Sequence, residues 1–393
     1  MEIPRNANKR SILLKIFVVA LIAAIVVLST SMFYRNKYNK LLAISAAMDV
    51  VETNYYFYDE KTDLTTLALR GIAANIGDNY SQYYTEEEYK QLLASNSGNY
   101  IGVGISVIDR GDGSYYINAV FDNTPASEAG IMVDDRIITI NGVSYEGLSM
   151  SDFLDYFSHD DGAVNIIAVE RGGEVIEYTL TMREVYSPYV EHKMLDNGIG
   201  YILIKGFQGK CVSEVDAAIE ELNSKGMTKL VLDLRDNLGG SLYDVNDIAG
   251  KFLPKGSLIT TVKSRTDSEQ AYLTETEGIS VPIALLVNNY SASASELLAG
   301  ALHDHGAARL FGQVTYGKGI VQTYYHLGNG LGYFKLTSDA YYTPNGVCIQ
   351  GTGIEPDVEV ALSDEWVNTA ISLIPQDEDA QLIAAIDYLK NLG

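Results

Sequence analysis

The chain has little positive charge. Among its 393 residues, 28 Lys and Arg stand against 51 Asp and Glu, which gives a formal net charge of −23. Proteins that bind nucleic acid need a basic surface to neutralise phosphates, so we expect no nucleic-acid partner. The acidic balance instead suits a soluble body that charge repulsion keeps dispersed.

Cysteine and histidine are also scarce. The two cysteines, Cys211 and Cys348, lie in separate segments and are too few for a disulfide framework. We expect two buried thiols, and a single bridge between them stays open. The cysteines lack the spacing of a zinc site, and the five histidines form no HExxH pattern. The sequence therefore predicts neither a metal site nor another cofactor.

Long apolar runs are absent except near the amino terminus, where Ile16–Met32 follows Ile12–Leu14. This stretch is long enough to cross, or nearly cross, a bilayer core of about 30 Å. By the positive-inside rule, the basic residues before it stay cytoplasmic and the rest of the chain faces outward. A cleaved signal peptide is the alternative, because Ser29-Thr30-Ser31 offers small residues to a peptidase. We favour an uncleaved single-pass anchor in the cell membrane.

The residue patterns divide the chain into four parts. Residues 1–40 form a basic stub and the transmembrane anchor, and residues 41–97 show the apolar spacing of a helical arm. Residues 98–185 contain short β-branched runs and turn signals, which predict a β-rich domain with one clear helix and a possible second one. Residues 186–393 alternate apolar strands with amphipathic helices, so the fold class is α/β, with a sheet covered by helices.

Ser291-Ala292-Ser293-Ala294-Ser295-Glu296 lies where an apolar strand is expected to meet a helix. Ser293 followed by Glu296 is the pattern of a capping box, which needs no catalytic role. The same geometry would expose the Ser293 hydroxyl on a sharp turn, beside free N–H groups of the helix start that can hold an oxyanion. Both interpretations remain open on this segment alone.

A second segment, Tyr316-Gly317-Lys318-Gly319, favours the catalytic interpretation of Ser293. Two flanking glycines let Lys318 approach other backbone closely, and a buried lysine loses charge and can act as a base. The 25 residues from 293 to 318 suffice for a helix, a turn and a strand to return to the site. Gln322 is placed to orient the amine. The segment is not a P-loop, because Gly319 stands where Ser or Thr would bind Mg²⁺.

A third segment, 232–240, reads Leu-Asp-Leu-Arg-Asp-Asn-Leu-Gly-Gly. A strand that ends in such a polar, glycine-paired turn can present a backbone N–H to an oxyanion. An ordinary β-turn, with Asp233 and Arg235 paired or capping, is the alternative.

Together these segments resemble the carboxyl-terminal processing peptidases, serine proteases of family S41. Ser291–Glu296 matches the family's SASASE, residues 316–322 match FGKGxVQ, and residues 232–240 match LDLRxNPGG. Residues 341–346 and 353–357 also look like the family. Leu238 stands in place of the usual proline and Asp236 in place of a usual asparagine. Since proline fixes φ, Leu238 is expected to loosen this turn without removing its N–H groups.

The resemblance implies a serine endopeptidase on a ClpP/crotonase-like domain. It assigns Ser293 as nucleophile, Lys318 as general base and Gln322 as the residue that assists Lys318. It also implies an oxyanion hole formed by the N–H groups of Gly239 and Ala294.

The β-rich part resembles a PDZ domain. Its carboxylate-binding loop would be Tyr100-Ile101-Gly102-Val103-Gly104-Ile105, and residues 126–131, 135–137 and 141–142 match its later pattern, although Val133-Asp134 replaces the usual proline-glycine. The resemblance implies that Ile101, Gly102, Val103 and Gly104 bind the carboxyl-terminal tails of protein substrates. It also implies a dimer formed through the helical arm. A catalytically impaired PDZ scaffold that only binds such tails is the alternative function.

Overall fold

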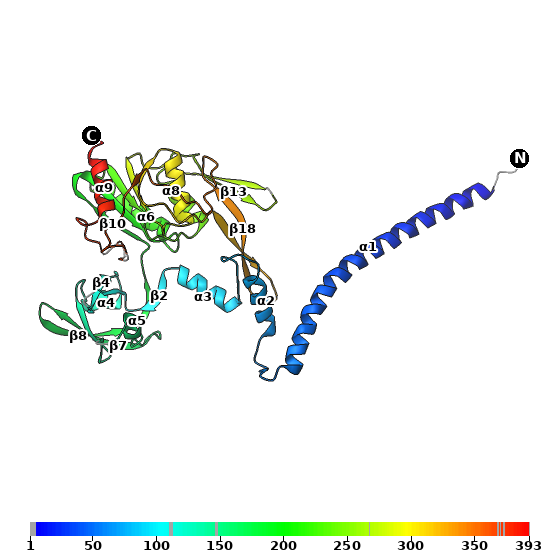
Figure 1. The fold of residues 1–393 in the computed structure, drawn as a ribbon, viewed down its shortest axis with the longest axis horizontal. Helices are drawn as coiled ribbons and strands as arrows, with labels where there is room; N and C mark the ends of the chain where they lie inside the picture. Colours follow the sequence, from blue (N-terminus) through cyan, green and yellow to red (C-terminus); the bar gives the residue numbers. More distant parts are fainter. Residues whose placement is uncertain are drawn as a thin grey trace. The chain divides into compact units, whose positions relative to one another are not determined.

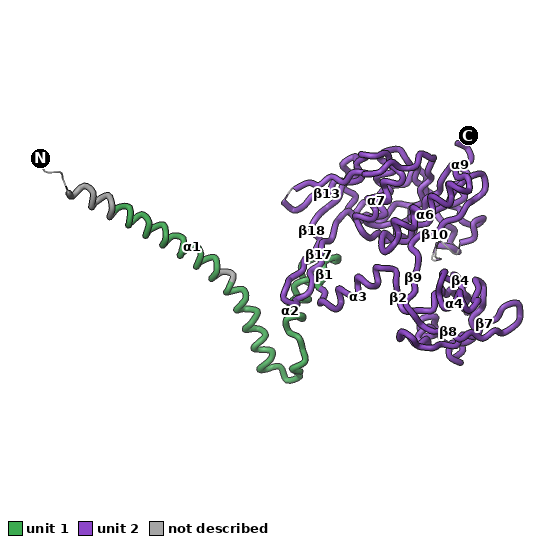
Figure 2. The backbone as a smooth tube through the Cα atoms, turned by 180° about the vertical axis from the view of Figure 1, so that it is seen from behind, with its two compact units in different colours: residues 1–83 green, residues 84–393 purple. Residues whose placement is uncertain are grey.

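The computed structural model describes residues 5–109, 113–145, 148–266, 268–367, 369, 371 and 374–392 (Figure 1). The chain divides into two compact units, residues 1–83 and residues 84–393, coloured separately in Figure 2. Each unit is described by itself.

Unit 1 is helical. α1 (Arg5–Asn54) is one continuous helix, and α2 (Leu64–Ala74) is capped by Asp63, whose Oδ1 accepts a hydrogen bond from the Thr66 N–H. Residues 14–54 of α1 are long and apolar enough to cross a membrane, a property that anchors and signal segments share. The predicted boundary at residue 40 is not a break in the helix, because residues 33–54 contain neither Gly nor Pro. β1 (Gln82–Tyr84) begins in this unit, whose last residue is Tyr83.

Unit 2 opens with α3 (Glu86–Asn96). Its start is a capping box: the Thr85 hydroxyl accepts from the Glu88 N–H, and the Glu88 carboxylate accepts from the Thr85 N–H.

A β-rich domain follows, with two short helices. Its main sheet has the order β3-β4-β5-β7-β8, with β6 paired to β5, and β2 pairs with β9 in a separate ribbon. Thirteen buried side chains, among them Ile117, Ile137 and Phe153, fill its own core. The elements are β2 (Asn99–Gly102), β3 (Ile105–Asp109), β4 (Tyr115–Val120), α4 (Pro125–Ala129), β5 (Arg136–Ile140), β6 (Val143–Ser144), α5 (Met150–Leu154), β7 (Val164–Arg171), β8 (Glu174–Thr181) and β9 (Arg183–Tyr186).

The last domain contains a sheet of order β10-β11-β12-β15-β16-β19, parallel except at β10. Alternate residues of its strands point to opposite faces. Ile202 and Leu232 pack in the core with α6, α7 and α8, whereas Leu203 and Val231 pack in the core with α9. Helices therefore cover both faces, as expected (Figure 1). The elements are β10 (Val190–Met194), the 3₁₀ turn η1 (Asp196–Gly198), β11 (Ile199–Ile204), α6 (Cys211–Ser224), β12 (Lys229–Asp233), α7 (Leu242–Ala249), β15 (Ile283–Val287), α8 (Ala294–Asp304), β16 (Ala308–Gly312), β19 (Val358–Glu359) and α9 (Ala380–Lys390).

A second, antiparallel sheet completes this domain. It contains β13 (Leu258–Ser264), β14 (Glu269–Leu273), β17 (Ile320–His326) and β18 (Tyr333–Tyr342), and β18 pairs with both β13 and β17. The carboxyl ends of β12 and β15 lie side by side in the main sheet, because the two strands are parallel neighbours. The turns that follow them therefore meet at one edge of the sheet.

Both cysteines are free thiols, and they differ in exposure. Burial, together with the negative charge of Asp244, raises the pKa of the Cys211 thiol to about 12, whereas Cys348 is half-buried. Because the thiolate is the reactive form, we expect a thiol reagent at pH 8 to modify Cys348 in the native protein and Cys211 only after unfolding. Thiol titration of wild type and Cys348→Ser, native and denatured, checks this. Equal reaction rates at both cysteines in the native protein would contradict it.

Candidate active site

Ser293 lies on the turn between β15 and α8 in a strained backbone conformation, with φ 58° and ψ −115°. A non-glycine residue in this region costs about 1–3 kcal/mol and persists only where its surroundings impose it. Ala294 is the first residue of α8, so its N–H has no partner within the helix. The structure thus places the predicted nucleophile beside a helix N-terminus, at the turn that the sequence indicates.

Glu296 holds this turn together. Its side chain is fully buried, and four donors share its two carboxylate oxygens. Oε1 accepts from the Thr315 hydroxyl at 2.6 Å and the Gly317 N–H at 2.7 Å. Oε2 accepts from the Ser293 N–H at 2.9 Å and the Lys318 N–H at 2.8 Å. The Ser293–Glu296 bond is the one that a capping box predicts, and the same carboxylate oxygen also holds the backbone of Lys318.

The two glycines beside Lys318 lie against other backbone. A Cβ on Gly319 would stand 2.6 Å from the Gln350 N, and one on Gly317 would stand 3.0 Å from the Gly353 N. Gly317 also has a φ of 87°, which favours glycine. The close approach that the sequence suggests for this segment is therefore present, and any side chain at either position would push Lys318 away.

Gln322 lies in β17, four residues beyond Lys318. Its Nε2 donates to the Thr337 hydroxyl of β18 at 3.2 Å, across the β17–β18 hairpin. The amide is therefore fixed by the neighbouring strand, and it lies on the strand that begins just after Lys318.

The glycine turn after β12 packs directly on the nucleophile turn. A Cβ on Gly239 would lie 2.6 Å from the Ala292 carbonyl oxygen and 2.9 Å from both the Ala294 N and the Ser293 Cβ, so only glycine fits. The Gly239 N–H donates to Asn237 Oδ1 at 2.9 Å. Leu238 between them is 68% exposed, so the residue that replaces proline packs against little of the protein.

The serines on either side of Ser293 tie the two turns together. The Ser291 hydroxyl donates to the Leu234 carbonyl oxygen at 2.8 Å, and the Ser295 hydroxyl donates to the Asn237 carbonyl oxygen at 2.7 Å. The Ala292 N–H donates to the same Asn237 oxygen. Asn237 is buried, and its Nδ2 donates to the Ile204 carbonyl oxygen. Sequence reasoning gave Asn237 and these two serines no role, although their polar side chains beside Ser293 and Gly239 were a usable signal.

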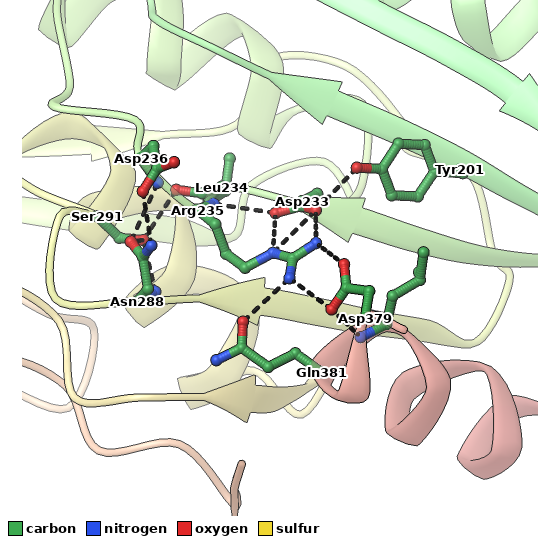
Figure 3. A network of polar contacts seen from close by, with 10 residues as sticks. Tyr201, Asp233, Leu234, Arg235, Asp236, Asn288, Ser291, Asp379 and Gln381 are labelled. Carbon is green, nitrogen blue, oxygen red and sulfur yellow. Dashed lines mark hydrogen bonds and ion pairs between the residues drawn. The ribbon is translucent and has the colours of Figure 1, made fainter. Parts of the chain in front are cut away.

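Arg235 anchors the start of the glycine turn in a buried polar network (Figure 3). Its guanidinium contacts Asp233 at 2.6 Å and Asp379 at 2.8 Å, and its Nη1 donates to Gln381 Oε1. Tyr201 donates its hydroxyl to Asp233. Burial alone would lower the pKa of Arg235, but the two carboxylates raise it, so the guanidinium stays charged. In the sequence, pairing with Asp233 was one of two alternatives for Arg235, beside capping, and Asp379 was missed.

The predicted tail-binding residues lie in the β-rich domain. Ile101 and Gly102 end β2, and Val103 and Gly104 lead into β3. Val103 is buried and its carbonyl oxygen accepts from the Ala126 N–H, whereas Ile101 is 38% exposed. Gly104 has a φ of 83°. Among the described strands, β3 is at the end of the order of the main sheet, where a peptide can add as a further strand.

Comparison with known proteins agrees with this architecture. Residues 198–360 match the model of peptidase family S41, and residues 116–171 match that of a PDZ domain. A "probable CtpA-like serine protease" of Staphylococcus haemolyticus is 30% identical over 391 residues, covering 97% of this chain and 78% of that protein. The protein of the same name from Staphylococcus aureus is 30% identical over 351 residues, covering 86% of this chain and 70% of that protein.

Two solved structures share the fold. The photosystem II D1 C-terminal processing protease superposes with a TM-score of 0.50 at 24% identity, covering 86% of this chain and 90% of its own. A putative S41 protease of Bacteroides fragilis superposes with a TM-score of 0.56 at 17% identity, covering 86% of this chain and 100% of its own. The chain therefore belongs to peptidase family S41, as a serine protease of the C-terminal processing type that carries a PDZ domain.

Proposed function

We propose that this protein is a membrane-anchored, extracytoplasmic endopeptidase that cleaves proteins near their carboxyl termini, with Ser293 as nucleophile, Lys318 as general base and Gln322 as the residue that supports Lys318. The observation that carries the proposal is the shared Glu296 Oε2, which accepts from the backbone N–H groups of both Ser293 and Lys318. One oxygen atom thus holds the two residues side by side, and the strained Ser293 conformation is of the kind that concentrates at active sites.

The reaction proceeds in two acyl-transfer steps. Ser293 Oγ attacks the carbonyl carbon of the scissile peptide and passes its proton to a neutral Lys318 amine. Lys318 then gives that proton to the leaving amine as the C–N bond breaks, which leaves an ester on Ser293. A water molecule attacks the ester, gives a proton to Lys318, and Ser293 leaves with that proton restored.

The oxyanion that forms in each step needs two N–H donors. The Ala294 N–H at the start of α8 is one of them, because a helix start leaves such groups without partners inside the helix. Gly239 is the second in this proposal, since it packs against Ser293 and Ala294. Its N–H must first leave the Asn237 side chain to which it donates. Gly239 therefore becomes a donor only when the turn moves, and a bound substrate provides the replacement acceptor.

The amino-terminal helix and the PDZ domain determine the location and the substrate in this proposal. α1 contains an apolar stretch long enough to span a bilayer, and basic residues precede it, so the domains after it face outward. The loop 101–104 and the edge strand β3 bind the tail of a protein substrate by strand addition. Residues 41–97 form the helical arm through which two copies associate.

Peptides that differ only in their last three residues test the proposal. The full-length wild-type protein, in detergent, is expected to cleave some of them at internal bonds near the carboxyl terminus, as read by mass spectrometry. Ser293→Ala and Lys318→Ala are each expected to leave no measurable cleavage while still binding the preferred peptides. A Ser293→Ala protein that cleaved as fast as wild type would exclude the catalytic assignment. Binding without cleavage by the wild type would establish the PDZ scaffold instead.

A further inference from the structure

The backbones of Ser293 and Lys318 are joined twice. Glu296 Oε2 accepts from both N–H groups, and the Tyr341 hydroxyl contacts both carbonyl oxygens. The distance from Tyr341 Oη to the Ser293 oxygen is 3.0 Å, and the same hydroxyl donates to the Lys318 oxygen. The two carbonyl dipoles thus point at one hydroxyl, whose hydrogen offsets their mutual repulsion.

The Ser293 carbonyl group has donors besides that hydroxyl. The Ser293 oxygen also accepts from the Glu296 and Leu297 N–H groups at 2.9 and 3.0 Å. The Lys318 oxygen accepts from the Tyr341 hydroxyl, which belongs to β18. The hydroxyl therefore ties the Lys318 carbonyl group to β18.

Lys318 needs such an external restraint because glycines flank it. Every neighbouring peptide group is bound from outside the segment: the Gly317 N–H by Glu296, the Gly317 carbonyl oxygen by the Gly351 N–H at 2.8 Å, and the Gly319 N–H by Gln350 Oε1 at 2.8 Å. Without side chains at 317 and 319, these bonds and the Tyr341 hydroxyl set the orientation of the Lys318 peptide.

Tyr341 is well suited to hold a fixed position. It is 1% exposed, and β18 pairs on both sides, with β13 and with β17. Its N–H donates to the Gly319 carbonyl oxygen at 3.0 Å. Burial, together with the negative charge of Glu296, raises the pKa of Tyr341 well above its usual range, so the phenol remains a donor.

We propose that Tyr341 is a positioning residue for the reaction: its hydroxyl holds the Lys318 carbonyl group and so aims the Lys318 amine at Ser293. This inference rests on the proposed roles of Ser293 and Lys318. Replacing Tyr341 with Phe keeps the ring packed in the core and removes only the hydroxyl. The Lys318 peptide then rotates between its two glycines, and the amine loses its alignment, whereas substrate binding is unaffected.

The test compares Tyr341→Phe with Tyr115→Phe in the full-length protein. Tyr115 is 4% exposed and its hydroxyl donates to the Leu148 backbone oxygen at 2.9 Å, in the core of the PDZ domain and outside the loop 101–104. Both variants lose one buried hydroxyl that donates to backbone carbonyl oxygens, two of them at Tyr341 and one at Tyr115, so both should lose thermal stability. Tyr341→Phe should lower kcat on the order of 10- to 100-fold with KM within about 2-fold. Tyr115→Phe should leave kcat unchanged.

A second measurement shows whether Tyr341 acts through Lys318. The rate at which a fluorophosphonate probe labels Ser293 should fall in Tyr341→Phe, yet Tyr341→Phe should add no further loss in a Lys318→Ala background. Wild-type kcat in Tyr341→Phe, or an equal further loss in the Lys318→Ala background, would overturn the inference. If Ser293→Ala itself retained activity, the proposed function would fail instead, so the two failures are distinguishable.

Discussion

Replacing Glu296 with Gln is expected to lower kcat/KM by about 100-fold or more and to lower the free energy of unfolding by about 2–5 kcal/mol. A carboxylate offers acceptors on both oxygens, and here each oxygen takes two donors. Gln turns one oxygen into an NH₂ group, which then faces two N–H or O–H donors and accepts from neither. Whichever way the amide is oriented, two buried donors lose their acceptor, and Lys318 or its neighbour is displaced.

Glu214→Gln is the matched control for this variant. One oxygen of Glu214, Oε2, accepts from the N–H groups of Tyr189 and Val190 at 2.9 and 3.0 Å. A Gln side chain keeps both bonds through its carbonyl oxygen, and its NH₂ group can donate to the Tyr186 hydroxyl, with which Glu214 also forms a hydrogen bond, so activity and stability should stay close to those of wild type.

Steady-state cleavage of a tail peptide and urea unfolding measure the two effects of Glu296→Gln. A variant that lost stability but kept kcat/KM would show that Glu296 only caps α8. Equal behaviour of Glu296→Gln and Glu214→Gln would show that the four-donor arrangement has no special effect.

Part of the Glu296 site is predictable from the sequence, because a capping box is a local pattern. Ser293 followed by Glu296 predicts the bond between the Ser293 N–H and the Glu296 carboxylate, and the structure contains it. The bonds from Thr315, Gly317 and Lys318 arise 19 to 22 residues further on. Whether a loop at that distance folds back onto the same carboxylate depends on strand order, which periodicity does not encode.

The same limit applies to the fold. Alternation of apolar strands and amphipathic helices indicates a covered sheet, and that sheet is present. The sequence leaves two local roles open for Asp233 and Arg235, pairing with each other or capping, and the structure contains the pair. Asp379 is 144 residues from Arg235, so its contact follows only once α9 packs on the sheet. By contrast, the continuity of α1 through residue 54 was readable from the absence of Gly and Pro between 33 and 54.

The strained backbone at Ser293 is connected, through Arg235, to a helix on the other face of the sheet. Ser293 is held at φ 58° by a turn that packs on Gly239, and the segment before Gly239 is fixed by Arg235. Arg235 in turn binds Asp379, the N-cap residue of α9, whose Oδ1 also accepts from the Leu382 N–H. α9 thus helps to fix the glycine turn although it lies on the other face of the sheet from α8. Loss of Arg235 should therefore lower both the stability of the protein and its kcat/KM.

Replacing Arg235 with Met is expected to destabilise the protein by about 3–5 kcal/mol, because it leaves two buried carboxylates, Asp233 and Asp379, without a counter-charge. For a domain of this size, that corresponds to a fall in Tm of about 6–20 °C. kcat/KM should fall as well, since the 236–240 turn loses its anchor. Thermal unfolding of the full-length protein in detergent and peptide cleavage below the variant's Tm measure both.

Two further variants separate charge from packing. Arg183→Met removes an exposed ion pair of similar length, 2.6 Å to Glu128, and should change Tm little because solvent screens such a pair. Adding Asp233→Asn and Asp379→Asn to Arg235→Met removes the stranded charges, and should recover part of the lost stability. If the triple variant were no more stable than Arg235→Met, lost side-chain packing and hydrogen bonding would account for the effect, and the buried charges would not. Recovery of stability without recovery of kcat/KM would show that the guanidinium also sets the geometry of the glycine turn.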